Sequence, residues 1–315
     1  MLAETHRELH SLFEMKEEDP NWLMGFKLID DRKNHTVTIS QAQYTGTLLK
    51  RLGMADCNLV STPLDPRLVL SKADCPQTED ERKEMARHPY REVLGAITWL
   101  AIVSRPDLAY ASSQLGQYSV NLGKLHWKAL TRVLRYLKGT QDGALTLGKV
   151  GNTDPDLLTG HTDASWANDP DDQRSTSGYI FQLGDTAVSW NSKKQHTVAA
   201  LSTEAKYMAL SHGAKQALWL RQFLRDVGLH TAESPPTTHL SVDNTGAIAL
   251  AKEARFHTRT KHIDVHYHFI RKHIEDGTFK VTHVPTMEML ADRFTKPLTC
   301  DGHQKMVNRL VLTKV

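Results

Sequence analysis

The chain has 315 residues, 40% hydrophobic and 24% charged, and its formal net charge at pH 7 is +3. This composition is ordinary for a soluble globular protein and leaves room for two domains, each with its own core. The chain contains no apolar run long enough to cross a bilayer and no apolar signal-peptide core at the N-terminus. Its three cysteines are widely spaced. We therefore expect an intracellular protein that is not secreted and has no membrane partner, and the mild basic excess is compatible with nucleic-acid binding.

The first part of the chain predicts a short amphipathic helix, a β-hairpin and a second helix. The helix is expected at residues 3–16 and the two strands at 22–29 and 36–39, with a polar loop between them. The second helix begins at Ser40, a suitable N-cap, and ends at Gly53.

Residues 56–89 contain prolines and a charged run that interrupt any periodicity, which indicates a linker or long loop. Three helices follow, from Tyr90 to the Arg105-Pro106 stop, from 108 to about 120, and from 125 to about 137. The last carries a row of cations that could follow a phosphate backbone or form an ordinary solvated face: Lys124, Lys128, Arg132 and Arg135.

A Gly-, Asn- and Pro-rich segment at 148–156 is the best domain boundary, and a different pattern follows it. Five strands are expected at 157–163, 178–183, 187–192, 238–242 and 279–284. Helices are expected at 204–227, 247–252, 262–274 and, after Pro285, around Asp292. This order predicts an α/β fold with a mixed sheet flanked by helices.

Four carboxylates stand at strand ends or helix starts in this second part, namely Asp163, Glu204, Asp243 and Asp292. Side chains at such places can converge at one edge of a sheet. Carboxylates brought together repel, and Mg²⁺, which prefers oxygen ligands, removes that conflict. Two such ions can stabilise an in-line phosphoryl displacement, which favours phosphodiester hydrolysis. The alternative is that each acid is only a turn or cap residue, as Glu204 in a first helical turn would suggest.

The residue strings around these acids resemble the RNase H domain of copia-type long-terminal-repeat retrotransposon Pol polyproteins. The strings begin at Gly160 (GHTDASWAND), Arg174 (RSTSGY), Ser189 (SWNSKKQ), Leu201 (LSTEAKYMA), Val242 (VDNTGAI), Arg259 (RTKHID) and Ala291 (ADRFTKPL). The first half is similar to the end of the same polyprotein's reverse transcriptase, through strings beginning at Ser61 (STP), Arg105 (RPD), His126 (HWKA) and Arg132 (RVLRYLKGT).

The resemblance implies an RNase H-like mixed five-stranded sheet, preceded by a mainly helical thumb- or connection-like region with a short hairpin. The expected units are palm end and thumb start at 1–55, linker and helices at 56–147, a linker at 148–156, the RNase H-like domain at 157–300 and a tail at 301–315. The implied activity is metal-dependent cleavage of the RNA strand of RNA/DNA hybrids, as an endonuclease using two Mg²⁺ ions, for which Mn²⁺ can substitute. The implied catalytic and metal-binding residues are Asp163, Glu204, Asp243 and Asp292.

Other expectations concern contacts and partners. Arg174, Lys193, Lys194 and Asn244 are candidate substrate contacts, although each charge could equally be a solvated one. The partners implied are the hybrid and the rest of a reverse transcriptase, in a cytoplasmic virus-like particle or the nucleus. Asp30-Asp31 lacks the aromatic residue that precedes the paired aspartates of a polymerase, so the polymerase acids are absent from this chain.

One departure from the family pattern lies beside the site. Lys206 replaces an acid that is common two residues after Glu204, and this makes the local field less negative. The alternative function is therefore an inactive nucleic-acid-binding remnant of a Pol polyprotein.

Overall fold

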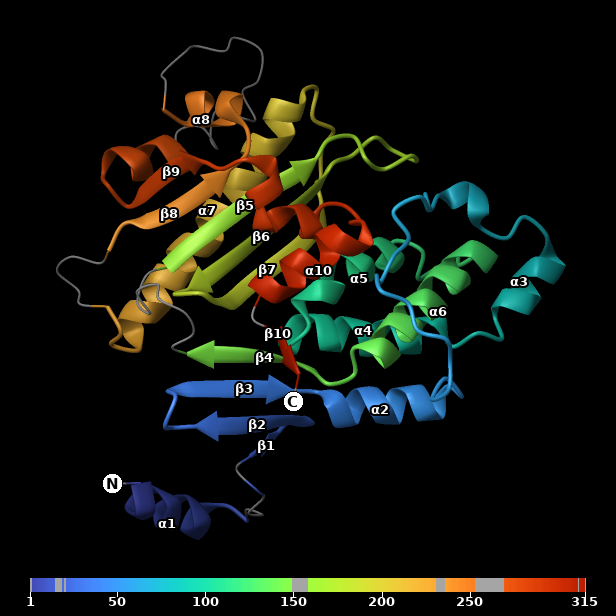
Figure 1. Ribbon diagram of the computed structural model, residues 1–315, viewed down its shortest axis with the longest axis horizontal. Helices are drawn as coiled ribbons and strands as arrows, with labels where there is room; N and C mark the ends of the chain where they lie inside the picture. The colour runs from blue at the N-terminus through green and yellow to red at the C-terminus, as the bar shows by residue number, and fades with distance from the viewer. Residues whose placement is uncertain are drawn as a thin grey trace.

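The structure is a computed structural model that describes residues 2–14, 19, 21–148, 158–230, 236–252, 269–310 and 312–314. Its described part contains two five-stranded sheets with helices packed beside and between them (Figure 1). Part of the helix expected at 262–274 falls outside the described residues, and residues 269–275 are helical.

The second sheet confirms the predicted mixed five-stranded fold. Its strands are β5 (Leu158–Ser165), β6 (Thr176–Leu183), β7 (Thr186–Lys194), β8 (Thr238–Val242) and β9 (Phe279–His283). They lie in the order β7-β6-β5-β8-β9, in which β5 and β8 and also β8 and β9 are parallel and the other pairs antiparallel. All but the last residue of β6 are buried, as expected for a strand covered on both faces.

Different elements cover the two faces of this sheet. The long helix α7 (Ser202–Asp226) packs on β5 and β6, and Gly213 allows the close approach, since a Cβ there would lie 2.4 Å from Thr162 Cγ2. The short helix α8 (Thr245–Lys252) packs on α7. The 3₁₀ helix η4 (Leu290–Phe294) lies against β5 and β6, and α5 (Ala109–Gly116) lies against β7.

The helical unit has its own hydrophobic core. It is built mainly by α4 (Tyr90–Val103), α5 and α6 (Lys124–Gly139), with α2 (Ala42–Arg51) against α6. Buried apolar residues such as Ile97, Leu100 and Leu130 fill it. The other helices described within residues 2–148 are α1 (Leu2–Leu12), η1 (Lys72–Asp74), α3 (Glu79–Met85) and η2 (Pro106–Leu108).

The predicted hairpin belongs to a larger antiparallel sheet. The hairpin strands β2 (Phe26–Asp31) and β3 (Thr36–Ser40) are joined by β1 (Trp22–Leu23), β4 (Gly143–Gly148) and β10 (Leu312–Lys314), in the order β1-β2-β3-β4-β10. Hydroxyl groups run across it, with Thr146 Oγ1 2.9 Å from both Thr38 Oγ1 and Thr313 Oγ1. The sequence did not predict β4, which is bounded by glycines, or β10, which has only three residues.

The segment after residue 299 also differs from a simple tail. It forms α10 (Cys300–Arg309), which buries His303 and Met306, and then β10. Leu145 of β4, Ile180 of β6 and Phe294 of η4 belong to the same buried cluster as Met306 and Leu310. The cluster therefore joins residues from both halves, whereas the unit boundaries expected from sequence stay predictions.

The helix expected around Asp292 is instead two short 3₁₀ helices, η3 (Thr286–Glu288) and η4. Met289 between η3 and η4 has an extended backbone, with φ −70° and ψ 103°, which interrupts any continuous helix through this segment. The segment therefore follows the sheet surface in short turns.

A buried polar network joins the helical unit to η4 and α10. Arg105 and Asp107 form two hydrogen bonds of 2.9 and 2.7 Å, and both side chains are almost fully buried. Tyr136 donates to Asp107 Oδ2 at 2.7 Å and contacts His303 Nε2 at 2.9 Å through the same hydroxyl. Arg293, next to Asp292 in η4, lies 3.3 Å from His303 Nδ1.

We predict that Asp107→Ala destabilises the whole protein, because Arg105 is then left buried without its counter-charge. Breaking a buried pair in this way costs about 3–5 kcal/mol. Urea unfolding measures the change. The matched control is Asp30→Ala, which removes an exposed pair with Arg32 and should cost less than about 1 kcal/mol. Equal effects of the two substitutions would contradict this prediction.

Candidate metal centre and nucleic-acid interface

Asp163 and Asp243 are brought together by the parallel pairing of β5 and β8. The register pairs His161 with Ser241, and each aspartate lies two residues further along its chain. Because the carboxyl ends of parallel strands meet at one edge of a sheet, the two side chains reach the same place. Both are buried, with 2% and 4% of the side chain exposed.

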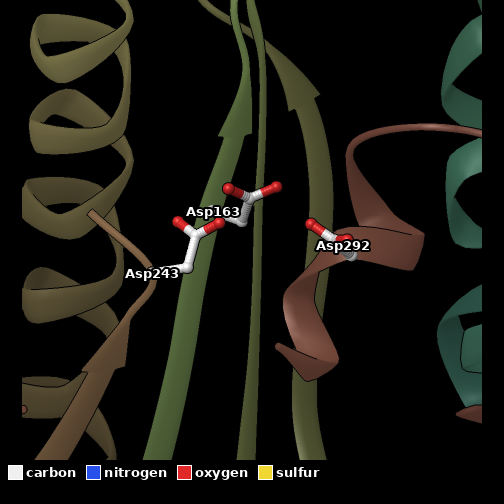
Figure 2. Close-up of side chains that lie close together, drawn as sticks. All are labelled: Asp163, Asp243 and Asp292. Carbon is white, nitrogen blue, oxygen red and sulfur yellow. The ribbon is translucent and has the colours of Figure 1, made fainter. Parts of the chain in front are cut away.

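Asp292 reaches the same place from η4, above the sheet. Gly178 of β6, which pairs with Asp163, makes this possible because a Cβ at Gly178 would lie 2.5 Å from Phe294 Cβ. One carboxylate oxygen from each of Asp163, Asp243 and Asp292 lies within 4.8 Å of the others. Figure 2 shows the three carboxylates turned toward a common space.

Lys206 of α7 enters this cluster. Its Nζ donates to Asp163 Oδ1 at 2.9 Å and to Asp243 Oδ1 at 2.5 Å, and the lysine side chain is 17% exposed. Lys296 Nζ lies 2.9 Å from Asp292 Oδ2. Two ammonium groups therefore face the three carboxylates.

The titration of these groups follows from burial and from their charged neighbours. Burial alone would raise the pKa of Asp163, but Lys206 and the Thr295 hydroxyl outweigh it and lower that pKa. Burial would lower the pKa of Lys206, yet its carboxylate partners raise it. Burial raises the pKa of Asp292 to about 6, assisted by the negative charge of Asp163 and opposed by Lys296.

The structure does not bring Glu204 into the group of three aspartates. Its Oε2 accepts a hydrogen bond from the Ala200 amide at 2.7 Å, which is a capping contact at the start of α7. Residues two apart on a helix point in nearly opposite directions, so Glu204 and Lys206 cannot both face the cluster. That spacing is a sequence signal that only one of positions 204 and 206 can face the site, and the contacts of Lys206 show that it is position 206.

The four substrate-contact candidates have different environments. Lys194 is held by Asp169 and Asp172 at 2.6 and 2.9 Å, and Arg174 lies 3.7 Å from Asp172. Asn244 accepts a hydrogen bond from the Ala247 amide at 2.8 Å and so caps α8. Lys193 is exposed on β7, and its side chain makes no hydrogen bond or ion pair with the residues that the structure describes, which makes it the most available of the four.

Three of the four cations along α6 contact protein groups. Lys124 lies 2.9 Å from Glu84, Arg132 donates to Thr62, and Arg135 donates to the Asn58 carbonyl. These partners belong to residues 56–89. The row therefore holds the preceding loop against α6, and the solvated or structural interpretation fits it better than a phosphate track.

The residues around the cluster do not fit two Mg²⁺ ions as they stand. Three aspartates supply suitable oxygen donors, and Asp292 Oδ1 is buried with no hydrogen-bond donor in the described part of the chain. However, an ammonium already bridges two of the aspartates, and Glu204 is engaged elsewhere. A metal would have to displace Lys206.

Curated proteins provide close matches to the sequence. A retrovirus-related Pol polyprotein from transposon TNT 1-94 of Nicotiana tabacum is 38% identical over 94% of this chain, and one from transposon RE2 of Arabidopsis thaliana is 38% identical over all of it. The chain spans 22% and 21% of their lengths. A secreted RxLR effector protein 161 of Plasmopara viticola is 48% identical over 43% of this chain and 94% of its own length. No protein-family model matches.

Two solved structures show a distant similarity. LC11-RNase H1, isolated from compost, aligns with 44% of this chain and 93% of its own, with a TM-score of 0.34 and 12% identity. A foamy viral protease-reverse transcriptase in complex with RNA/DNA hybrid aligns with 66% of this chain and 27% of its own, with a TM-score of 0.37 and 12% identity.

The chain belongs to the retrovirus-related Pol polyproteins of copia-type transposons. This confirms the family expected from the sequence motifs. No described helix is both long and apolar enough to span a bilayer.

We predict that Asp292→Asn stabilises the protein at alkaline pH. A carboxyl group whose pKa rises from 3.8 to about 6 on folding favours the fold below pH 3.8 and loses that contribution as the pH rises through 6. The substitution should therefore raise the free energy of unfolding by on the order of 1–2 kcal/mol at pH 8 and by little at pH 4. Urea titrations at both pH values measure it, and a loss of stability at pH 8 would contradict the raised pKa.

Proposed function

We propose that residues 158–310 form the RNase H-type domain of a retrotransposon Pol polyprotein and that the domain binds RNA/DNA hybrids. The observation that carries this proposal is the convergence of Asp163, Asp243 and Asp292 at one edge of a mixed sheet, in a chain of the Pol family. The helices before it would be the thumb- or connection-like end of a reverse transcriptase.

In this proposal the protein recognises the hybrid through contacts with the sugar-phosphate backbone of the nucleic acid. A protein distinguishes the RNA strand by its 2′-hydroxyls and by groove shape, and gains affinity from phosphate contacts. Lys193 would contact a phosphate, because it is the exposed cation on β7 with no protein partner among the described residues. The domain would work beside a reverse transcriptase palm, in a virus-like particle or the nucleus.

Between binding and cleavage, the geometry favours binding. The ammonium of Lys206 bridges Asp163 and Asp243, so the site lacks the free carboxylates that a pair of divalent cations requires. The second candidate is the metal-dependent endonuclease that hydrolyses the RNA strand. One observation favours it, namely that one oxygen from each of the three aspartates still lies within 4.8 Å of the others.

We predict that the full chain binds an RNA/DNA hybrid with an affinity that falls steeply with salt, and that Lys193→Glu weakens this binding. Loss of a phosphate contact should reduce the slope of log affinity against log salt by about 1. Fluorescence anisotropy with a labelled hybrid measures both quantities. Lys280→Glu is the matched control, since Lys280 is an exposed lysine on β9, the opposite edge strand of the same sheet.

The full chain is the correct material, because η4 packs against α5 and His303 of α10 contacts Tyr136 of the helical unit. Absence of hybrid binding at low salt would refute the proposed function. Gel analysis of the same hybrid with Mg²⁺ or Mn²⁺ distinguishes the two candidates. Cleavage that disappears in Asp163→Asn would establish the endonuclease.

A further inference from the structure

We infer that the ammonium group of Lys206 is the resident cation of the aspartate cluster and keeps divalent metal out of it in this chain. The inference deepens the proposed function. It rests on that function only in its predicted effect on hybrid cleavage. Its core is a statement about metal binding, which can be measured without any nucleic acid.

The ammonium group of Lys206 lies between two of the clustered aspartates. Lys206 Nζ contacts one oxygen of Asp163 and one of Asp243, which are two of the three residues that could share a metal. The lysine is held there from α7, a 25-residue helix packed on β5 and β6, and not by a mobile surface contact. An ammonium and a divalent cation cannot occupy the same space between these oxygens.

Most carboxylate oxygens of the cluster already have a partner in the protein. Five of the six oxygens of the cluster already accept a hydrogen bond or ion pair from a side chain. The pairs are Asp163 Oδ1 with Lys206, Asp163 Oδ2 with Thr295, Asp243 Oδ1 with Lys206, Asp243 Oδ2 with Thr286, and Asp292 Oδ2 with Lys296. Of these six oxygens, only Asp292 Oδ1 has no hydrogen-bond donor among the described residues. The cluster is thus satisfied by the protein itself.

The electrostatic environment of Lys206 explains why the lysine and the aspartates stay together. A cation in the first turns of a helix is unfavourable because the helix dipole is positive there. Lys206 lies in the first turns of α7 and is mostly buried, so its position depends on the two carboxylates that it contacts. Conversely, those carboxylates would repel each other without it. The lysine and the aspartates therefore stabilise one another, as a bound metal and its ligands do.

The geometry also says what residue at this position would admit a metal. Position 206 faces Asp163 and Asp243, while Glu204 faces the Ala200 amide. A carboxylate at position 206 would therefore add a fourth acid to the cluster in place of the competing ammonium. Lys206→Glu should convert a metal-excluding site into a metal-binding one, which is a gain that a purely structural role of Lys206 does not predict.

The experiment measures Mn²⁺ binding to the full chain, by calorimetry and by the Mn²⁺ electron paramagnetic resonance signal. We expect no site-specific binding by the parent protein and binding at least about tenfold tighter by Lys206→Glu. Lys206→Glu/Asp163→Asn should lose the gain. Lys215→Glu is the matched control, because it makes the same charge change at an exposed position of the same helix and should bind as the parent does.

A second variant keeps the test decisive if Lys206→Glu folds poorly. Lys206→Gln removes the ammonium without adding a carboxylate, and circular dichroism verifies its fold. We expect it to bind Mn²⁺ more tightly than the parent and to gain thermal stability when Mn²⁺ is added. Mn²⁺ binding by the parent that is as tight as by Lys206→Glu, and is lost in Asp163→Asn, would overturn the inference. So would a folded Lys206→Gln without any gain.

The same samples separate this inference from the proposed function. Hybrid cleavage by Lys206→Glu in Mg²⁺, absent in the parent, supports both. Gain of Mn²⁺ binding without hybrid binding by either protein supports the resident cation and refutes the proposed function. Hybrid binding by the parent together with parental Mn²⁺ uptake at the cluster supports the function and refutes the resident cation.

Discussion

The structure depends on a buried arrangement of charges between its two halves. Arg105 and Asp107 neutralise each other where both side chains are almost fully buried, and Tyr136 and His303 extend that pair to Arg293 in η4. Buried ions are tolerated only when paired and hydrogen-bonded, so these elements have to meet in one orientation. Because Asp292 is the neighbour of Arg293, the helical half helps to fix one member of the aspartate cluster.

The cluster itself follows the same rule on a smaller scale. Three carboxylates within 4.8 Å need positive charge, and there are two ways to supply it, a metal from solution or a lysine from the chain. This chain has Lys206 at the position that faces the aspartates. In the proposed function, this single side chain would decide whether the same backbone holds a site for hydrolysis or a surface that only binds.

Much of this arrangement could be predicted from the sequence, and the exceptions have physical reasons. The strands β5 to β9 have clear apolar patterns and were predicted closely, and the motifs identified three aspartates that do converge. Glu204 was grouped with them by its motif, although a rotation of about 200° separates it from the residue that faces the site. The strand β10 and the contact of Tyr136 with His303 depend on partners more than a hundred residues away, which local patterns do not contain.

The pairing of β10 with β4 affects the order in which the protein can form during synthesis. Thr313 lies beside Thr146, so residues 312–314 complete a sheet whose other strands lie within residues 22–148. A ribosome must therefore synthesise residues 149–311 before the N-terminal sheet has its final edge. Until then β4 presents an open edge, which is the kind of surface that pairs with other chains. Slow translation of the second half would prolong that exposure.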